Sequence, residues 1–358
     1  MTHVFVAPHP DDAALSCGGL IASLRELGQN VAFLTVYSGT EDRDGDLTAY
    51  QREALGFGSK ALWPASETFN RSSILADWPS AALVPSWAAD DDQLEATQTD
   101  ADAAAKRFWQ RSSWYRRASI RNESLAGQPV IDDLSTQGPV FTDSVAEAAV
   151  AGDLMARRRI EDERFAYFAE AAIVFLDLPD AVFRGYQGDD QLLGQPLPED
   201  QPPYEILRRE ILRLEPQRIY FPLAVGGHVD HRLCRAVGMA MLGEDPGWVM
   251  PGPDFSKAVV FYEDFPYAWW EEFRRIEDLG VDVLDALPTG VTLAPQYSDV
   301  TDQIERKITG ISMYESQLER LFDGPLEMGD AVRSHARLIA ELGEVPGMAE
   351  RYWVADRV

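Results

Sequence analysis

Two short segments of the chain carry residues that together could bind a metal ion and move protons. One is PHPDD at residues 8–12, and the other is GGHVDH at residues 226–231. The chain has five histidines, and three of them fall in these two segments, each of which also contains aspartate. Imidazole nitrogen and carboxylate oxygen are ligands that zinc accepts, and a catalytic zinc keeps three protein ligands and one open position.

His9 and Asp12 lie three positions apart, so one turn of loop or helix can direct both side chains at one point. A third ligand must come from the other segment, and either His228 or His231 can supply it. Such a metal lowers the pKa of its water towards ~7. The same nitrogen and oxygen donors suit Fe²⁺ as well as Zn²⁺.

The remaining residues of the two segments could carry out the proton transfers. Asp11 is adjacent to Asp12 but points in a different direction, so it could act as a general base. The histidine that is not a ligand, if protonated, could stabilise an oxyanion or protonate a leaving amine. Asp230, between the two histidines, could keep that imidazole charged.

Each segment also has a purely structural interpretation. HPDD alone could be a strand-to-helix turn, in which Pro10 fixes φ and an aspartate caps the helix. HVDH alone could arise by chance at the start of a helix. The occurrence of both favours the metal site, provided that the fold brings them together.

The pattern of apolar residues predicts that the fold brings the two segments together. Apolar runs at 3–8 and 30–39 flank a helical pattern at 15–28 that ends at Gly28, which is a βαβ unit and indicates a parallel sheet. Helix and strand patterns then alternate at 156–171 and 172–181, at 204–216 and 218–227, and at 231–242 and 257–265. An extended run at 291–300 and a long amphipathic helix at 300–322 follow. We therefore predict an α/β fold, with a Rossmann-like, mostly parallel sheet flanked by helices.

Both segments directly follow predicted strands. Ligands of open parallel sheets bind outside the carboxyl ends of the strands, so PHPDD and GGHVDH should lie on the same rim. Tyr262, Glu263 and Asp264 end a later strand on that rim. We expect Tyr262 and Asp264 to contact a substrate, although a tyrosine at a strand end often only packs.

Residues 41–150 interrupt the alternation, and we expect a large insertion there, after the second strand, within a single domain that spans 1–358. The segment is rich in Ala, Asp, Ser and Thr, yet it holds five of the nine tryptophans, which is unusual for a disordered linker. We predict that it is partly helical. Its basic, aromatic stretch at 107–117 could be a packed helix or a contact for an anion or sugar.

Charge and composition exclude several classes of protein. The formal charge is −27 over 358 residues, which disfavours nucleic acids and anionic membranes as partners. No apolar run approaches the ~20 residues that span a bilayer. Cys17 and Cys234 are too few for a disulfide framework. These features predict a cytoplasmic protein, and they leave the oligomeric state open.

With both segments in view, the chain resembles the PIG-L (LmbE-like) family of zinc-dependent N-deacetylases, which act on N-acetylglucosaminyl conjugates and related N-acyl compounds. Besides PHPDD and GGHVDH, the stretches RRRIEDERFAYF, LDLPDAVFRG and YEDFPYA are similar to segments of one branch of the family. The resemblance covers residues 1–40 and about 150–320, and the part between them looks like an insertion.

The resemblance implies a role for each residue of the two segments. His9, Asp12 and His231 match the zinc ligands, and Asp11 matches the general base. His228 matches the histidine that stabilises the tetrahedral intermediate, and Asp230 matches the carboxylate beside it.

The chain departs from the family pattern at two places. Ala13 stands where many members have a glutamate. The residues AVGG precede the second histidine segment, where some sugar deacetylases have a tyrosine. A tyrosine contribution would therefore have to come from another part of the chain, or be absent.

We therefore expect a metal-dependent hydrolase that removes an N-acetyl or other N-acyl group from a glycan or small sugar conjugate through a metal-bound water. Two alternatives stay open. The same metal could serve an esterase or phosphoesterase, although the acidic surface and the lack of a phosphate-binding loop argue against it. The chain could also be a non-catalytic, metal-bearing carbohydrate-binding module.

Overall fold

A computed structural model describes residues 1–39, 154–243, 258–270, 291–322 and 325–357. Residues 1–60 and 158–358 group into one compact unit and residues 61–157 into another. The predicted insertion at 41–150 and its stretch 107–117 lie outside the described residues, so their structure stays a prediction.

The core of the described unit is a seven-stranded sheet with the order β3-β2-β1-β4-β5-β7-β6. The strands are β1 (Thr2–Ala7), β2 (Asn30–Thr35), β3 (Ala172–Phe175), β4 (Arg218–Pro222), β5 (Val259–Tyr262), β6 (Val291–Asp299) and β7 (Ala349–Arg357). The first five in sequence are parallel, and β7 and β6 add an antiparallel edge. The predicted α/β fold with a mostly parallel sheet is confirmed.

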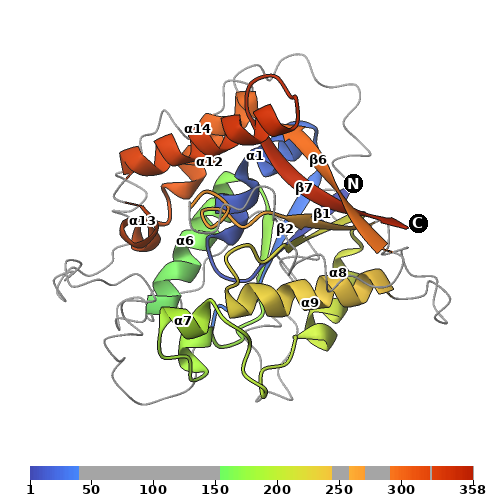
Figure 1. Cartoon of the computed structure of the whole chain (residues 1–358), viewed down its shortest axis with the longest axis vertical. Helices are drawn as coiled ribbons and strands as arrows, with labels where there is room; N and C mark the ends of the chain where they lie inside the picture. Colours follow the sequence, from blue (N-terminus) through green and yellow to red (C-terminus); the bar gives the residue numbers. More distant parts are fainter. Residues whose placement is uncertain (40–153, 244–257, 271–290, 323–324, 358) are drawn as a thin grey trace, which may run out of the picture. The chain divides into compact units, whose positions relative to one another are not determined.

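Helices cover both faces of the sheet (Figure 1). They are α1 (Asp12–Glu26), α6 (Leu154–Phe168), α7 (Asp189–Leu192), α8 (Tyr204–Leu214), α9 (Val229–Gly243), α12 (Ile304–Ile311), α13 (Glu315–Leu321) and α14 (Pro325–Leu342), with short 3₁₀ turns η2 (Ala181–Phe183) and η3 (Thr301–Gln303). In Figure 1, α1, α12 and α14 lie across the sheet from α8 and α9. Among the described residues, no helix is both long and apolar enough to cross a bilayer.

The order of the strands creates a crevice at the site. From β1 the chain runs through α1 to β2 and β3 on one side, and it returns through α8 to β4 and β5 on the other side. Strands β1 and β4 are therefore neighbours whose following helices lie on opposite faces. Such a switch point leaves a crevice at the carboxyl ends of the two strands, where ligands of α/β proteins bind.

The predicted helix at 300–322 is broken into η3, α12 and α13, and two carboxylates of α6 explain the break. The hydroxyl of Tyr314 donates to Oδ1 of Asp162 over 2.6 Å in the core. Glu161 accepts the backbone N–H of Ser316 at the start of α13 over 2.9 Å. These buried bonds turn the chain between α12 and α13.

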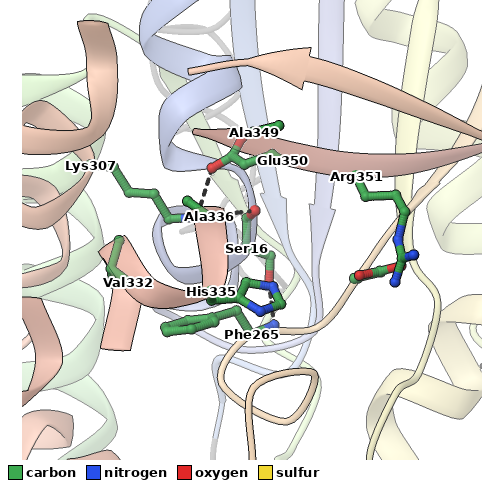
Figure 2. Close-up of a pocket in the computed structure, with 10 residues that line it drawn as sticks. Ser16, Phe265, Lys307, Val332, His335, Ala336, Ala349, Glu350 and Arg351 are labelled. Carbon is green, nitrogen blue, oxygen red and sulfur yellow. Dashed lines mark hydrogen bonds and ion pairs between the residues drawn. The ribbon is translucent and has the colours of Figure 1, made fainter. Parts of the chain in front are cut away.

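Helix α1 approaches its neighbours closely where its glycines face them. A Cβ on Gly19 would lie 2.8 Å from Cβ of Val300, so any larger residue would push α1 away. Here the carboxylate of Glu350, on β7, accepts hydrogen bonds from the Gly19 N–H over 3.0 Å and from the Lys307 ammonium over 2.6 Å. Figure 2 shows this buried pair beside a small cavity that Ser16 and His335 also line.

Candidate active site

The two histidine segments meet at the switch point. PHPDD follows β1, GGHVDH follows β4, and the two strands are parallel neighbours in the sheet. The ring centroids of His9 and His228 are 4.8 Å apart, those of His9 and His231 5.3 Å, and those of His228 and His231 5.2 Å. All three side chains are at most 9% exposed. Residues more than two hundred positions apart thus form one buried cluster.

The carboxylate of Asp12 lies between two of these imidazoles. Its Oδ2 is 3.4 Å from Nδ1 of His9 and 3.4 Å from Nε2 of His231. The same oxygen accepts the backbone N–H of His9 over 2.8 Å, which fixes the carboxylate. Ligands of a tetrahedral zinc with bonds of 2.0–2.1 Å are separated by roughly 3.3 Å. The two distances to Asp12 are close to that separation.

Each of the two imidazoles is held by a second carboxylate on its other nitrogen. Nε2 of His9 is 2.9 Å from Oδ2 of Asp230, and Nδ1 of His231 is 2.6 Å from Oδ1 of Asp264. A histidine that binds a metal usually donates its other ring N–H in this way. The arrangement leaves Nδ1 of His9 and Nε2 of His231 directed at Asp12.

The electrostatics of the cluster also fit a cation. Burial alone lowers the pKa of His9, but the carboxylates of Asp180, Asp12 and Asp230 outweigh it and raise this pKa to about 10. The pKa of His231 is raised as well, because Asp12 and Asp264 outweigh its burial. Without a metal the site thus holds extra protons, and metal binding releases such protons.

Other donor groups are also present at this rim. One ring nitrogen from each of His9, His228 and His231 lies within 4.8 Å of the others, and so do ligand atoms of His9, Asp180 and Asp230. The anchored ring of His231 and its approach to Asp12 favour His231 over His228 as the third ligand.

Asp11 occupies the N-cap position of α1 in a strained conformation, with φ at 111°. Non-glycine residues rarely adopt positive φ, and such strain often accompanies function. The side chain of Asp11 makes no capping hydrogen bond to α1, so the capping interpretation does not apply to it. Burial raises the pKa of Asp11 to about 7, although Arg158, 3.5 Å away, works against the rise. A carboxylate with such a pKa suits a general base near neutral pH.

The expected pairing of Asp230 with His228 is not what the structure contains. The Asp230 carboxylate contacts His9. It also accepts hydrogen bonds from the backbone N–H of Ala181 over 3.1 Å and from the guanidinium of Arg184 over 2.5 Å. Within the part of the chain that the structure describes, the His228 ring accepts one hydrogen bond, from the backbone N–H of Asp230 to its Nδ1 over 3.3 Å. Burial, followed by the nearby His9 and His231, holds the pKa of His228 well below its usual value. His228 is therefore neutral here, which corrects the expectation that Asp230 keeps it charged.

Tyr262 and Asp264, which we expected to contact substrate, both bond to other parts of the protein. Tyr262 is 1% exposed, and its hydroxyl donates to the backbone oxygen of Val6 over 2.9 Å. Asp264, also 1% exposed, anchors His231 and accepts the N–H of Val225 over 2.8 Å. Glu263 pairs with Arg351. Tyr262 thus packs in the core and the Asp264 carboxylate holds the His231 imidazole, and a substrate contact of either residue stays a prediction.

Three charged residues of the site are not among those predicted from the sequence. Asp180 lies 3.7 Å from Nε2 of His9, Arg158 approaches both Asp11 and Asp180, and Arg184 joins Asp230 to Asp200. Asp180 and Arg184 lie in LDLPDAVFRG, which follows β3 on the same rim. The strand-end rule that selected the other segments could therefore have selected this one.

Fold and site together define an α/β protein with a mostly parallel sheet and a histidine–aspartate cluster at the switch point of that sheet. Residues 4–63 match the PIG-L family, whose description is GlcNAc-PI de-N-acetylase. The resemblance seen in the sequence is thus confirmed.

Two relatives share the same name. The 2'-N-acetylparomamine deacetylase of Streptomyces fradiae is 32% identical over 168 residues, which cover 46% of this chain and 54% of the relative. The enzyme of that name from Niallia circulans is 27% identical over 165 residues, or 43% and 54% of the two chains. The chain therefore spans about half the length of these relatives.

Solved structures share the fold over nearly the whole chain. The zinc-inhibited form of teicoplanin deacetylase Orf2 is 19% identical, with a TM-score of 0.54 and coverage of 100% of this chain and 99% of that one. The A40926 pseudoaglycone deacetylase Dbv21 is 20% identical, with a TM-score of 0.52 and coverage of 99% and 97%. At this identity the likeness establishes the fold.

Proposed function

We propose that the chain is a metal-dependent N-deacetylase that removes an acetyl group from the nitrogen of an amino sugar or a small sugar conjugate. The observation that carries the proposal is the position of the Asp12 carboxylate between His9 and His231, each imidazole being anchored by a buried carboxylate. The description of the matching PIG-L family and the names of the two N-acetylparomamine deacetylases support this chemistry.

His9, Asp12 and His231 would hold the cation, which we propose to be Zn²⁺, with Fe²⁺ as a second ion that suits these donors. When bound, such an ion polarises a carbonyl and lowers the pKa of a coordinated water. Asp230 and Asp264 fix the two imidazoles through their other nitrogens. Their contribution is to present the three donors in one orientation before any substrate arrives.

The other residues of the cluster would transfer protons and stabilise charge. Asp11 accepts a proton on its carboxylate as the oxygen of water bonds to the amide carbon. Neutral His228 has one N–H, which can donate to the carbonyl oxygen as negative charge develops there. The proton on Asp11 then passes to the nitrogen as the C–N bond breaks, which releases acetate and the free amine.

The test is acetate release by purified protein across a panel of N-acetyl amino sugars, before and after removal of metal with a chelator. We expect activity that disappears with the metal and returns when Zn²⁺ is added. Asp11→Asn should retain the metal but lose about 10²–10⁴-fold in kcat. The proposal is wrong if the loaded protein is inert on every N-acyl amine, or if Asp11→Asn equals the parent. Phosphate esters and carboxylic esters in the same panel test the alternative hydrolases.

A further inference from the structure

Two aromatic side chains lie beside the cluster, on the turn that follows β5. The ring of Tyr267 meets His231 edge to face, with centroids 6.0 Å apart and an interplanar angle of 86°. The ring of Trp270 meets Tyr267 in the same way, at 5.2 Å and 82°. Both residues are half-buried, so each keeps part of its surface exposed. We call Tyr267 and Trp270 the aromatic pair.

Because Gly226 has no side chain, the ring of Tyr267 can pack against the second histidine segment. A Cβ on Gly226 would lie 2.6 Å from the Tyr267 ring, and the φ of this glycine is +83°. Only a residue without a side chain can adopt this conformation and leave room for the ring. The sequence thus has a glycine before His228 because an aromatic ring from another loop packs there.

The ring of Tyr267 lies against His231, one of the proposed metal ligands, and Trp270 packs on the ring of Tyr267. The aromatic pair therefore adjoins the proposed ligands through Tyr267. Ligand sites of this kind are lined mainly by apolar and aromatic side chains with a few polar groups.

We propose that the aromatic pair is the surface on which the sugar ring of the substrate rests, with Trp270 as the residue that distinguishes pyranose substrates from acyclic N-acyl amines. One face of a pyranose ring presents C–H groups, which pack against the flat, electron-rich face of an aromatic ring. A ring held there places its N-acyl group towards His231. This inference rests on the proposed function and names the substrate class of that site.

The neighbouring Trp269 provides a matched control. Its ring lies against His335, with centroids 6.2 Å apart. His335 in turn packs on Phe265 at 5.3 Å, beside the cavity drawn in Figure 2, where it lies near Ser16. Trp269 and Trp270 are adjacent in sequence and both half-buried, yet Trp270 packs on Tyr267, whereas Trp269 packs on His335 of α14.

The experiment compares Trp270→Leu, Trp270→Phe and Trp269→Leu with the parent in the metal-loaded protein. The substrates are methyl N-acetylglucosaminide and N-acetylethanolamine, which share the amide but not the ring. We expect Trp270→Leu to raise KM for the glucosaminide about tenfold or more, with kcat within about twofold and no change for N-acetylethanolamine. Trp270→Phe should recover most of the loss because it restores an aromatic face, and Trp269→Leu should match the parent on both substrates.

Calorimetric binding of the glucosaminide to the same proteins separates the inference from the proposed function. A parent that binds the sugar but hydrolyses nothing, with binding lost only in Trp270→Leu, contradicts the deacetylase proposal and supports the inference. A parent that hydrolyses the glucosaminide, with equal effects of Trp270→Leu and Trp269→Leu, supports the deacetylase proposal and overturns the inference. Equal losses on both substrates in Trp270→Leu overturn it as well, and a parent that neither binds nor hydrolyses the sugar overturns both.

Discussion

Oδ1 of Asp264 lies 2.6 Å from Nδ1 of His231, and both side chains are at most 2% exposed. The aspartate comes from the end of β5 and the histidine from the start of α9, so the contact joins two neighbouring strand ends. Because the carboxylate holds one nitrogen of the imidazole, the other nitrogen stays directed at Asp12. Asp264 thus orients a proposed metal ligand without being one itself.

Asp264→Asn should weaken metal binding by about 10–100-fold, the usual cost of losing such a supporting carboxylate. The amide can still accept a hydrogen bond, but it no longer carries the negative charge that makes the imidazole a stronger ligand. Competition between the protein and a chelator for Zn²⁺ measures the change. Asp302→Asn, which alters an exposed carboxylate on η3, is the control. Equal affinities for Asp264→Asn and the parent would contradict this role.

The second prediction concerns the pH dependence of turnover. Asp11 must be deprotonated to accept a proton, so kcat/KM should rise with pH through the pKa of Asp11. That pKa is about 7 without a metal, mainly because of burial. Metal binding displaces the protons on His9 and His231, so one positive charge replaces another and the rise in the loaded protein should stay near neutral pH.

Arg158 tests whether this rise belongs to Asp11. Its guanidinium is 3.5 Å from the Asp11 carboxylate and lowers the pKa of that group. Arg158→Gln should therefore move the rise in kcat/KM to higher pH. Arg159→Gln removes the next arginine, which instead pairs with Asp177 over 2.7 Å, and should leave the profile where it is. A profile that is the same in all three proteins would assign the rise to another group.

The third prediction concerns the stability of the site. Arg184 neutralises Asp230, which is fully buried, and also bonds Asp200. Arg184→Gln leaves the Asp230 charge buried with less compensation, and removing one partner of such a pair costs about 3–5 kcal/mol. Denaturant unfolding measures the loss. Arg333→Gln, in an exposed pair with Glu305, should change stability little. Similar stabilities of the two variants would mean that His9 and the Ala181 N–H suffice for Asp230.

The convergence of His9, Asp12 and His231 could be predicted from sequence because it follows from topology alone. Both segments come directly after buried strands, and parallel strands end at one rim. The outcome did not depend on the path of any long loop. The role of Asp264 was harder to predict, because a strand-end position does not say whether its carboxylate meets substrate or a neighbouring imidazole.

The remaining features depend on contacts between distant elements. Tyr262 is the last residue of β5, and its side chain turns inward to the backbone of Val6, on a strand more than 250 residues earlier. Helical periodicity ran smoothly through 300–322, yet Asp162 and Glu161 of α6 bend the chain there. Arg184 reaches Asp230 from a 3₁₀ turn too short to leave a pattern in the sequence. Such pairings have no local signal.

The last prediction concerns His3, which lies on β1 away from the histidine–aspartate cluster. Its ring stacks on Tyr220, and its Nδ1 is 3.1 Å from the Tyr220 hydroxyl. Burial, together with nearby positive charge that includes Arg218, lowers the pKa of His3 from 6.5 to about 4. In the unfolded chain the imidazole takes up a proton near pH 6.5, whereas in the folded protein it stays neutral down to about pH 4. The stability contributed by neutral His3 is therefore complete above pH 6.5 and is lost as pH falls towards 4.

A variant without a titrating group at this position should lose less stability on acidification. Between pH 7.5 and 5.5 we expect the free energy of unfolding of the parent to fall by about 1 kcal/mol more than that of His3→Gln. Urea denaturation of both proteins at both pH values, at the same metal content, measures this difference, and the comparison cancels the titration of the histidine–aspartate cluster. Tyr220→Phe keeps the imidazole buried and should retain the pH dependence of the parent. If His3→Gln and the parent fall in parallel, His3 is protonated to the same extent in the folded and unfolded states, and its burial between β1 and β4 does not affect its charge.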